Sequence, residues 1–279
     1  MPVATSGQRV FGFTLNSKPG STVWLPMIER EGVESGLCLR KMYRLHGQTV
    51  RSHNVRYFLG HERVDGEVAV PIIPGSVSNL LSWIQARDAN NQGACADCIE
   101  DRVNQVVKAS DVKVAKATFE FRHGRAVFVI LEVSGPNIAP GKVLQSNVPT
   151  LAPYVFNEVE FKLAHHGQSL ENETGIAYLR VVIDNNIAEG DLRNVGNIRA
   201  YGHFTREITD DTVLSDFAAG VETAATIAMS RGAATCLLTL PRILYTDHVV
   251  LSQGGVLFER VSFFAFASVD GITPPISLI

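Results

Sequence analysis

The sequence predicts an α+β fold with a mainly antiparallel sheet, and three observations lead to this prediction. Stretches rich in β-branched and apolar residues recur along the chain, separated by turn residues, as in strands. Other stretches carry apolar residues at i, i+3 and i+4 spacing, as in helices. The predicted elements follow one another roughly as β, β, α, α, β, β and then β, β, α, β, β, an order that indicates an α+β domain.

The length and composition are those of an ordinary globular protein. The 279 residues permit one large domain with a buried core. A hydrophobic fraction of 46% and a charged fraction of 19% exclude an intrinsically disordered chain. The net charge of −3 does not favour a nucleic-acid-binding protein, although an acidic protein can present one basic face, because screening limits the reach of charges to roughly 10 Å.

The first helix is predicted where a strand runs into a turn. Residues 67–73 are β-branched and apolar, and the Pro-Gly pair at residues 74–75 ends the strand. Ser76 or Gly75 suits the N-cap position, and the free backbone N–H groups of a helix start attract anions such as phosphate. The apolar stripe of the helix consists of Val77, Leu80, Leu81 and Ile84.

Further elements follow from the same two periodicities. A second helix is predicted over residues 97–109, and a third and longest one over residues 215–231, with Gly232 at its end. Residues 122–125 form a basic hairpin tip between two strands. The predicted strands cover residues 111–121, 126–133, 155–163, 176–183, 235–240, 243–251 and 256–269.

One segment of the chain is strongly basic. No Asp or Glu occurs between residues 40 and 56, which is the composition expected of a segment that contacts phosphates. The Pro- and Gly-rich residues 135–153, which include Lys142, form a long loop of the kind that is often functional. The basic segment contains Arg40, Lys41, Arg44, Arg51 and Arg56, with His46 and His53 among them.

Signatures of catalysis and of metal binding are weak. The chain has no P-loop, GxGxxG, HExxH or GxSxG motif, so we expect no cofactor and no catalytic residue. Cys95 and Cys98 have the spacing of half a zinc site, but no second CxxC or paired His follows them. The residues that could complete such a site, only through tertiary contact, are Cys38, His46, His53 and His61.

A near match to one enzyme motif remains. The stretch HERVDGEVAVP contains His61, Gly66 and Pro71 and resembles, with an offset of one residue, the HxxxGxxxxP motif of polyketide dehydratases. This resemblance implies a hot-dog fold that acts on acyl thioesters, with His61 as the general base. The chain offers no matching carboxylate motif for the acid, so the dehydratase is an alternative and not the preferred interpretation.

The order of several motifs resembles a different family. Residues 40–251 contain, in succession, a basic loop, VAVPIIPGSVSNLL, a Pro/Gly-rich loop, FNEVEFKLAHHG, ETGIAYLRVVID, and AAGVETAATIAMSRGAA leading to LTLP. This succession is similar to the backbone subunit of CRISPR effector complexes, in the Cas-seven branch of the RAMP superfamily. The resemblance implies one RRM-like (ferredoxin-like) palm over residues 1–279, with a helical insertion at about residues 85–110 and a thumb or web loop at about residues 135–153.

The same resemblance implies a function and a set of contacts. Subunits of that family stack head to tail along a guide RNA (crRNA) and act in antiviral defence with other effector-complex subunits and a target nucleic acid. Guide binding of this kind uses cations, backbone amides and hydroxyls and needs no catalytic group. Carried over by position, the RNA-binding residues are Arg40, Lys41, Arg44, His46, Arg51, His53, Arg56, Ser76, Ser78, Asn79, Lys142 and Arg231.

Two other classes stay open beside guide binding, namely the hot-dog dehydratase and a self-assembling viral or phage structural protein. The first residues lack the features of a signal peptide, and no apolar run approaches about 18 residues. The sequence therefore predicts a cytoplasmic protein with no membrane partner. Copurifying nucleic acid would favour guide binding, a dimer free of RNA would favour the dehydratase, and assembly without RNA would favour the structural protein.

Overall fold

The computed structural model describes most of the chain. It covers residues 9–28, 36–46, 56–86, 93–102, 105–141, 151–165, 168–187, 198–271 and 273–278. For residues 40–46, 56–62 and 137 only the backbone is described. A helix with the length and apolar character needed to cross a membrane is absent from these residues.

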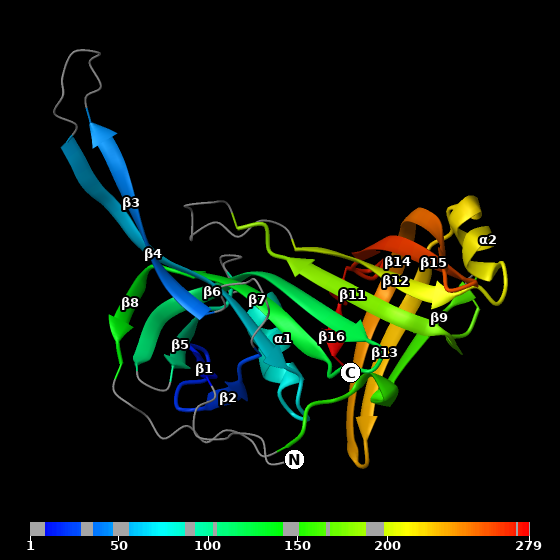
Figure 1. The fold of residues 1–279 in the computed structure, drawn as a ribbon, viewed down its shortest axis with the longest axis horizontal. Coiled ribbons are helices and arrows are strands. Elements are labelled where there is room, and N and C mark those ends of the chain that lie inside the picture. Colours follow the sequence, from blue (N-terminus) through cyan, green and yellow to red (C-terminus); the bar gives the residue numbers. More distant parts are fainter. Residues whose placement is uncertain are drawn as a thin grey trace.

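The architecture is dominated by antiparallel β-sheet. Strand accounts for 62% and helix for 10% of the structure, and the strands form one 16-stranded sheet (Figure 1). The prediction of an α+β, RRM-like palm is therefore wrong. Such a palm needs helices that cover one face of a small sheet, whereas the described chain has two short α-helices of 9 and 8 residues.

The sheet is built from two units, each with four strands, a short helix and further strands. The N-terminal unit contains β1 Val10–Leu15, β2 Thr22–Pro26, β3 Gly36–His46, β4 Arg56–Pro71, α1 Val77–Gln85, β5 Ala96–Asp101, β6 Val106–Arg122, β7 Phe128–Gly135 and β8 Asn137–Pro140. The C-terminal unit follows the 3₁₀ turn η1 Phe156–Glu158 and contains β9 Val159–Leu163, β10 Glu171–Asn172, β11 Ile176–Asp184, β12 Arg199–Glu207, α2 Thr212–Ala219, β13 Thr223–Arg231, β14 Ala234–Gln253, β15 Val256–Phe266 and β16 Ser277–Leu278.

The spatial order of the strands is the same in both units. The N-terminal unit reads β2-β1-β5-β6-β7-β4-β3 from edge to edge, and the C-terminal unit reads β10-β9-β13-β14-β15-β12-β11. In each unit the last strand, β8 or β16, pairs with the long strand, β6 or β14. The chain thus contains the same structural unit twice.

Local details show which positions of the two units correspond. The long strands β6 and β14 carry a register shift at the same place, at Ala115 and at Thr246, where each pairs with its following strand. Gly66 on β4 and Gly202 on β12 also correspond. A Cβ atom at Gly66 would lie 2.4 Å from a carbonyl oxygen of the paired strand, and one at Gly202 would lie 2.1 Å from the corresponding oxygen. Both glycines are therefore required by the same close strand approach.

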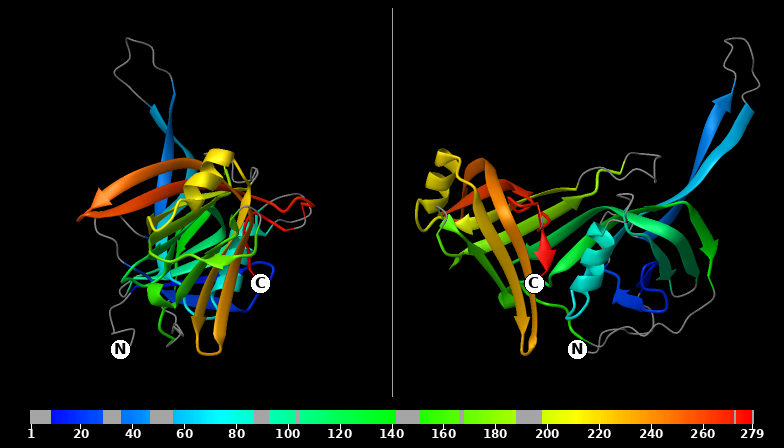
Figure 2. Two further views of the ribbon diagram at one scale, coloured as in Figure 1. Left: turned by 90° about the vertical axis from the view of Figure 1, so that its right-hand side faces the viewer. Right: turned by 180° about the vertical axis from the view of Figure 1, so that it is seen from behind.

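Strands β11 and β6 join the two units. Residues 178–184 of β11 pair antiparallel with residues 116–122 of β6, so the sheet continues from one unit into the other. Inward-facing residues on both sides of this junction, such as Ile183 and Phe119, are fully buried. Figure 2 shows the β3–β4 ribbon extending from one end of the molecule, with α2 and the β14–β15 hairpin at the opposite end.

The predicted helix after the turn at residues 74–75 is confirmed as α1. Its apolar stripe faces the core, where the rings of Trp83 and Phe13 stack with centroids 4.9 Å apart. The indole N–H of Trp83 donates to the Val112 carbonyl at 3.0 Å. A large buried ring whose polar group is satisfied fixes the helix against the sheet.

The two other helix predictions are wrong, one entirely and one in large part. Residues 97–101 and 106–109 lie in β5 and β6, and Cys98 and Glu100 both point into the core from alternate positions of β5. Residues 215–231 contain only the end of α2, because Gly220 stops the helix with a φ of 62°. The alanine-rich strand β13 follows, and its pairing with β9 and β14 overrides the helical preference of alanine.

Most strand predictions are confirmed, and the basic hairpin tip lies between β6 and β7 as predicted. Residues 235–251 form part of a single strand, β14, because Pro241 stands at a register shift where the ladder needs no N–H. Within the predicted helical insertion at about residues 85–110, residues 96–101 and 106–110 form strands. Within the predicted thumb or web loop, residues 137–140 form β8, while residues 142–150 lie outside the described residues.

Candidate functional site

The described parts of the basic segment, residues 40–46 and residue 56, belong to a projecting ribbon. Strands β3 and β4 pair from Gly36 opposite Glu67 to His46 opposite Arg56, and they extend away from the body of the sheet (Figure 1). Arg51 and His53 lie outside the described residues, and His61, the expected dehydratase base, is described only as a backbone position on β4. Backbone positions alone are likewise described for Arg40, Lys41, Arg44, His46 and Arg56.

The residues expected to bind RNA at the helix start have different environments. Ser76 is buried, and its hydroxyl donates to the Ile73 carbonyl at 2.8 Å. It stabilises the turn into α1 and is not available to a phosphate. Ser78 is exposed and Asn79 is half-buried in the first turn of the helix, and Lys142 lies outside the described residues.

Arg231 belongs to a structural contact at the end of β13. Its guanidinium forms an ion pair with Glu158 and donates to the carbonyls of Ala152 and Pro153 at 2.6 and 2.7 Å. The hydrogen bond from Arg231 holds the pKa of Glu158 below its ordinary value. Arg231 thus connects β13 to the segment before β9, which leaves it less able to bind RNA than the sequence suggests.

The Cys95–Cys98 pair finds no complete set of metal ligands among the described side chains, which do not include those of His46, His53 and His61. Cys98 is fully buried, and burial raises the pKa of its thiol, which disfavours the thiolate that metals bind. Among the described residues, no group of three or more His, Cys, Asp or Glu side chains could hold a metal ion.

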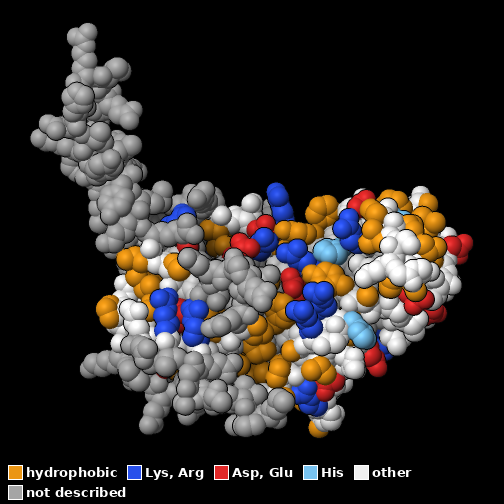
Figure 3. Space-filling view, viewed as in Figure 1, with side chains coloured by type: hydrophobic (Ala, Val, Ile, Leu, Met, Phe, Trp, Pro, Cys, Tyr) orange, Lys and Arg blue, Asp and Glu red, His pale blue; other side chains and the backbone are white. Residues whose placement is uncertain are grey.

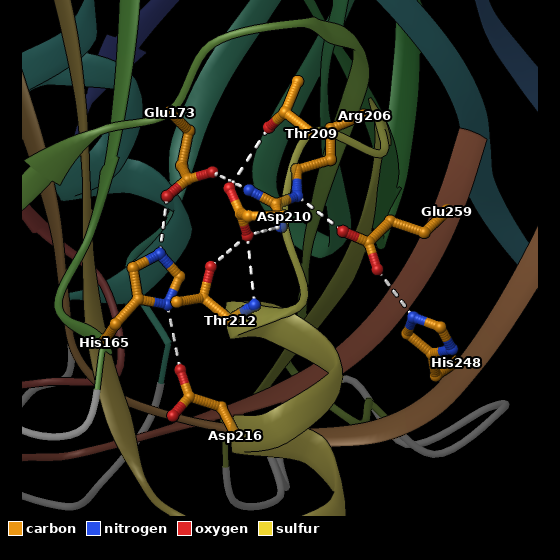
Figure 4. Close-up of polar contacts among 9 residues, drawn as sticks. All are labelled: His165, Glu173, Arg206, Thr209, Asp210, Thr212, Asp216, His248 and Glu259. Carbon is orange, nitrogen blue, oxygen red and sulfur yellow. Dashed lines mark hydrogen bonds and ion pairs between the residues drawn. The ribbon is translucent and has the colours of Figure 1, made fainter. Parts of the chain in front are cut away.

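A buried charge network lies in the C-terminal unit (Figure 4). Arg206 on β12 is 2% exposed and forms ion pairs with Glu173 at 2.6 Å, Asp210 at 3.0 Å and Glu259 at 2.6 Å. Burial alone would lower the pKa of Arg206, but the hydrogen bond to Glu259 and the charge of Glu173 raise it above its ordinary value. Hydrogen bonds from Thr212, together with the Arg206 guanidinium, hold the pKa of Asp210 well below its ordinary range. Arg206 thus connects three segments that are distant in the sequence.

Two histidines extend this network. His165 lies between Glu173, 2.6 Å from its Nε2, and Asp216 on α2, 2.9 Å from its Nδ1. Burial opposes the charged form of His165, but the two carboxylates outweigh it and raise its pKa. His248 on β14 contacts Glu259, with 2.6 Å between Nε2 and Oε2. The network therefore fastens α2 and β14 to the rest of the sheet.

The network does not have the properties of an active site. Glu173 lines a pocket of about 170 Å³, whose other lining is largely apolar. Both carboxylate oxygens of Glu173 are occupied, one by His165 and one by Arg206, and both oxygens of Glu259 are occupied in the same way. A general acid or base must reach its substrate, and neither of these buried carboxylates has a free oxygen to do so. We therefore interpret the network as a structural clamp.

The second half of β14 has an open edge. In the N-terminal unit the corresponding half of β6, residues 116–122, pairs with β11 on the side opposite β7. Residues 247–253 of β14 pair with β15 on one side, but the described residues supply no strand on the other side. Strand β3, the counterpart of β11, likewise pairs only with β4 in the described chain. The chain therefore contains one complete strand junction, between β11 and β6, and two strand edges, at β3 and at the second half of β14, that have no partner strand in the described residues.

Apolar residues at these two edges are exposed, although their counterparts in the internal junction are buried. Val250 on β14 is 54% exposed, whereas its counterpart on β6, Phe119, is 0% exposed. Leu39 on β3 is 42% exposed, whereas its counterpart on β11, Ile183, is 0% exposed. The edges thus lack the cover that the internal junction provides, which is a feature of interaction surfaces.

A comparison with models of known protein families gives no match, and a comparison with curated proteins gives none either. Neither comparison therefore favours guide binding, a dehydratase or a structural protein. The function has to be inferred from the repeated units and their open edges.

Proposed function

We propose that the chain is a self-assembling structural subunit, of the kind that builds viral or phage particles, and that its copies join head to tail through their sheet edges. The repeated topology carries this proposal, because β11 adds to β6 inside the chain while the corresponding strands β3 and β14 have open edges in the described residues. In the proposed contact, β3 of one copy pairs antiparallel with the second half of β14 of the next copy. Strand addition of this kind gains main-chain hydrogen bonds along the whole contact.

Charged residues support the register that the internal junction predicts. Inside the chain, Asp184 on β11 stands opposite Lys116 on β6. The corresponding positions place Arg40 of one copy opposite Asp247 of the next. In the internal pair the acidic residue lies on β11, whereas in the contact between copies it lies on β14. Both pairs combine opposite charges, which stabilises neighbouring residues across two strands.

The hairpin next to the open β14 edge shows the same difference between the units. Val127, which precedes β7, is 0% exposed, and its N–H donates at 2.8 Å to Tyr154 in the segment that leads into the second unit. Its counterpart near the start of β15, Leu257, is 54% exposed. A following unit supplied by a neighbouring copy would cover Leu257 as the C-terminal unit covers Val127.

The geometry of the two edges favours assemblies larger than a dimer. The β3 edge and the β14 edge are different surfaces at opposite ends of the molecule (Figures 1 and 2). A contact between two different surfaces leaves one of each free after every addition, so it continues until a ring closes or extends as a helix. The apolar positions Leu39 and Val250 then become buried at every repeat.

The other interpretations have less support. Guide-RNA binding goes together with an RRM-like palm, which the fold does not contain, and Ser76 and Arg231 are engaged in contacts of the fold itself. For the dehydratase, only the backbone of His61, the expected base, is described, so no acid is placed beside it.

The proposal can be tested with the full chain after nuclease treatment. We expect light scattering to give a mass of several copies, and electron microscopy to show rings or helical tubes of uniform width without nucleic acid. A monomer at all accessible concentrations would contradict the proposal. So would a two-fold dimer that does not grow, because a two-fold contact uses the same surface on both copies.

A further inference from the structure

One face of the central sheet carries an unusual combination of side chains. On β11, β12 and β15 the residues that point away from the core include Tyr178, Arg180, Tyr201, His203, Arg260 and Phe264. We call these residues the basic-aromatic face. Figure 3 shows lysine, arginine and histidine side chains interspersed with hydrophobic and some acidic ones over the middle of one side of the molecule.

The rings of this face lie side by side across neighbouring strands. Tyr178 and His203 have ring centroids 5.3 Å apart, and Tyr201 and Phe264 have centroids 6.2 Å apart. Phe264 is 47% exposed, which leaves a large aromatic surface in contact with solvent. An aromatic cluster on a sheet face, outside the core, is a surface that can stack with planar ligands.

The arginines of this face are available to a ligand. Within the part of the chain that the structure describes, Arg180 and Arg260 form no ion pair, although Glu120 on β6 stands opposite Arg180. Arg260 is exposed and Arg180 is half-buried, with its Nε atom buried and without a hydrogen-bond partner there. By contrast, Arg206 and Arg242 are bound to carboxylates.

The electrostatic environment of His203 agrees with a locally positive surface. His203 stands opposite Arg180 on β11 and lies one strand away from β15, which carries Arg260. Burial lowers the pKa of His203, and the charges of Arg180 and Arg260 lower it further. The six residues of the basic-aromatic face include two arginines and no carboxylate, in a chain whose net charge is −3.

We propose that the basic-aromatic face binds single-stranded nucleic acid, with the arginines at phosphates and the rings against unpaired bases. Cations combined with exposed rings on a sheet are the arrangement that recognises single strands without sequence preference. A duplex hides the faces of its bases and offers only phosphates to such a surface. This activity is separate from the proposed assembly, and it uses other residues than the basic ribbon of β3 and β4.

The test is the fluorescence anisotropy of labelled oligothymidylate with the purified full chain at several salt concentrations. Replacing both Arg180 and Arg260 with Gln should flatten the slope of log K against log salt by about 1.4, because each phosphate of a single strand that is no longer neutralised changes the slope by about 0.7. Replacing Tyr201 and Phe264 with Leu preserves apolar bulk but removes the rings, and it should weaken binding by about tenfold. Arg125→Gln, which removes an exposed arginine at the β6–β7 hairpin tip, is the matched control and should leave binding unchanged.

Circular dichroism and thermal melting establish that each variant is folded before its binding is interpreted. A duplex of equal length and inorganic polyphosphate serve as competitors, and we expect both to compete more weakly than unlabelled single strand. Equal competition by polyphosphate together with unchanged binding by the Leu variant would overturn the proposal, because binding would then depend on charge alone. Binding that disappears only when Arg44, Arg51 and Arg56 are replaced would overturn it as well, and so would the absence of any binding.

Discussion

Replacement of Val250 by Asp should abolish assembly without unfolding the subunit. Val250 is 54% exposed in the isolated chain, so the substitution should change the free energy of unfolding by about 0.5 kcal/mol or less. In the proposed contact the side chain becomes buried, as Phe119 is in the internal junction at 0% exposure. Full burial of such an apolar side chain contributes roughly 1.5–3 kcal/mol, so burying the remaining half contributes about 1 kcal/mol.

The carboxylate of Val250→Asp has a larger effect than the missing apolar burial, because a buried charge without a partner costs several kcal/mol. We therefore expect association to weaken by about 3 kcal/mol or more, which is about a hundredfold in the dissociation constant. Sedimentation velocity over a range of concentrations measures this change, and thermal melting checks the fold. Leu151→Asp is the matched control, because Leu151 is 53% exposed and lies outside β3 and β14, next to the Ala152 carbonyl that Arg231 binds at the end of β13. Wild-type assembly by Val250→Asp, or an equal effect of the control, would refute the reasoning.

Three further predictions concern charged residues. Arg40→Asp and Asp247→Arg should each weaken assembly, measured as mass by light scattering, because each places like charges opposite one another. The double variant should restore assembly. A double variant that assembles as weakly as the single ones would contradict the register. Arg206→Met should lower the free energy of unfolding, measured in urea titrations, by about 3–5 kcal/mol because it leaves buried carboxylates unpaired. The control Arg242→Ala breaks an exposed ion pair and should lower the free energy of unfolding by about 1 kcal/mol or less. Equal effects of the two substitutions would show that the buried network does not act as a clamp. Folding raises the pKa of His165, so protonated His165 stabilises the folded state fully at pH values below its ordinary pKa of about 6.5, and this stabilisation is lost as pH rises through the folded pKa. His165→Gln should therefore reduce the decline of the melting temperature between about pH 6 and pH 9. An unchanged pH profile of the melting temperature would refute this role.

Local structure could be predicted from the sequence where one periodicity dominates. Helix α1 follows from four apolar residues at helical spacing after a Pro-Gly turn, and the β6–β7 hairpin follows from two alternating stretches around a basic tip. The errors occur where tertiary pairing decides. Glu100 occupies a core position of β5 because Arg9 and Arg102 pair with it, and no hydrophobic pattern marks such a residue. The alanines of β13 fit a helix as well as a strand between two neighbours.

The repeated unit was not detectable from residue identities. Corresponding positions in the core share size and burial rather than residue type, as the fully buried β-branched residues Val112 and Ile243 do, and Gly66 and Gly202 are among the few identical ones. Strand order is determined by backbone pairing that many different side chains satisfy. The open edges are equally hidden in the sequence, because whether an apolar strand residue is covered depends on which strand lies beside it.

The charge network was also beyond prediction from the sequence. Its members come from segments that lie far apart along the chain, and only the fold brings Arg206 to Glu173 and Glu259. In the sequence, the most prominent charged feature is the basic run from residue 40 to residue 56, where charge is concentrated locally. In the fold, residues 40–46 and residue 56 of that run belong to a projecting ribbon, and one edge of this ribbon is β3, which pairs only with β4 among the described strands.

The most direct test of the head-to-tail contact uses a cysteine that the chain already contains. The register of the internal junction, where Val182 stands opposite Thr118, places Cys38 of one copy opposite Val249 of the next. Opposite residues of an antiparallel pair have Cβ atoms about 4.5–5.5 Å apart, and a disulfide then needs only a small shift. Val249→Cys should therefore give, under mild oxidation, a ladder of covalent multimers on a denaturing gel that disappears when Cys38→Ala is added. Absence of the ladder, or a ladder that persists without Cys38, would contradict the contact.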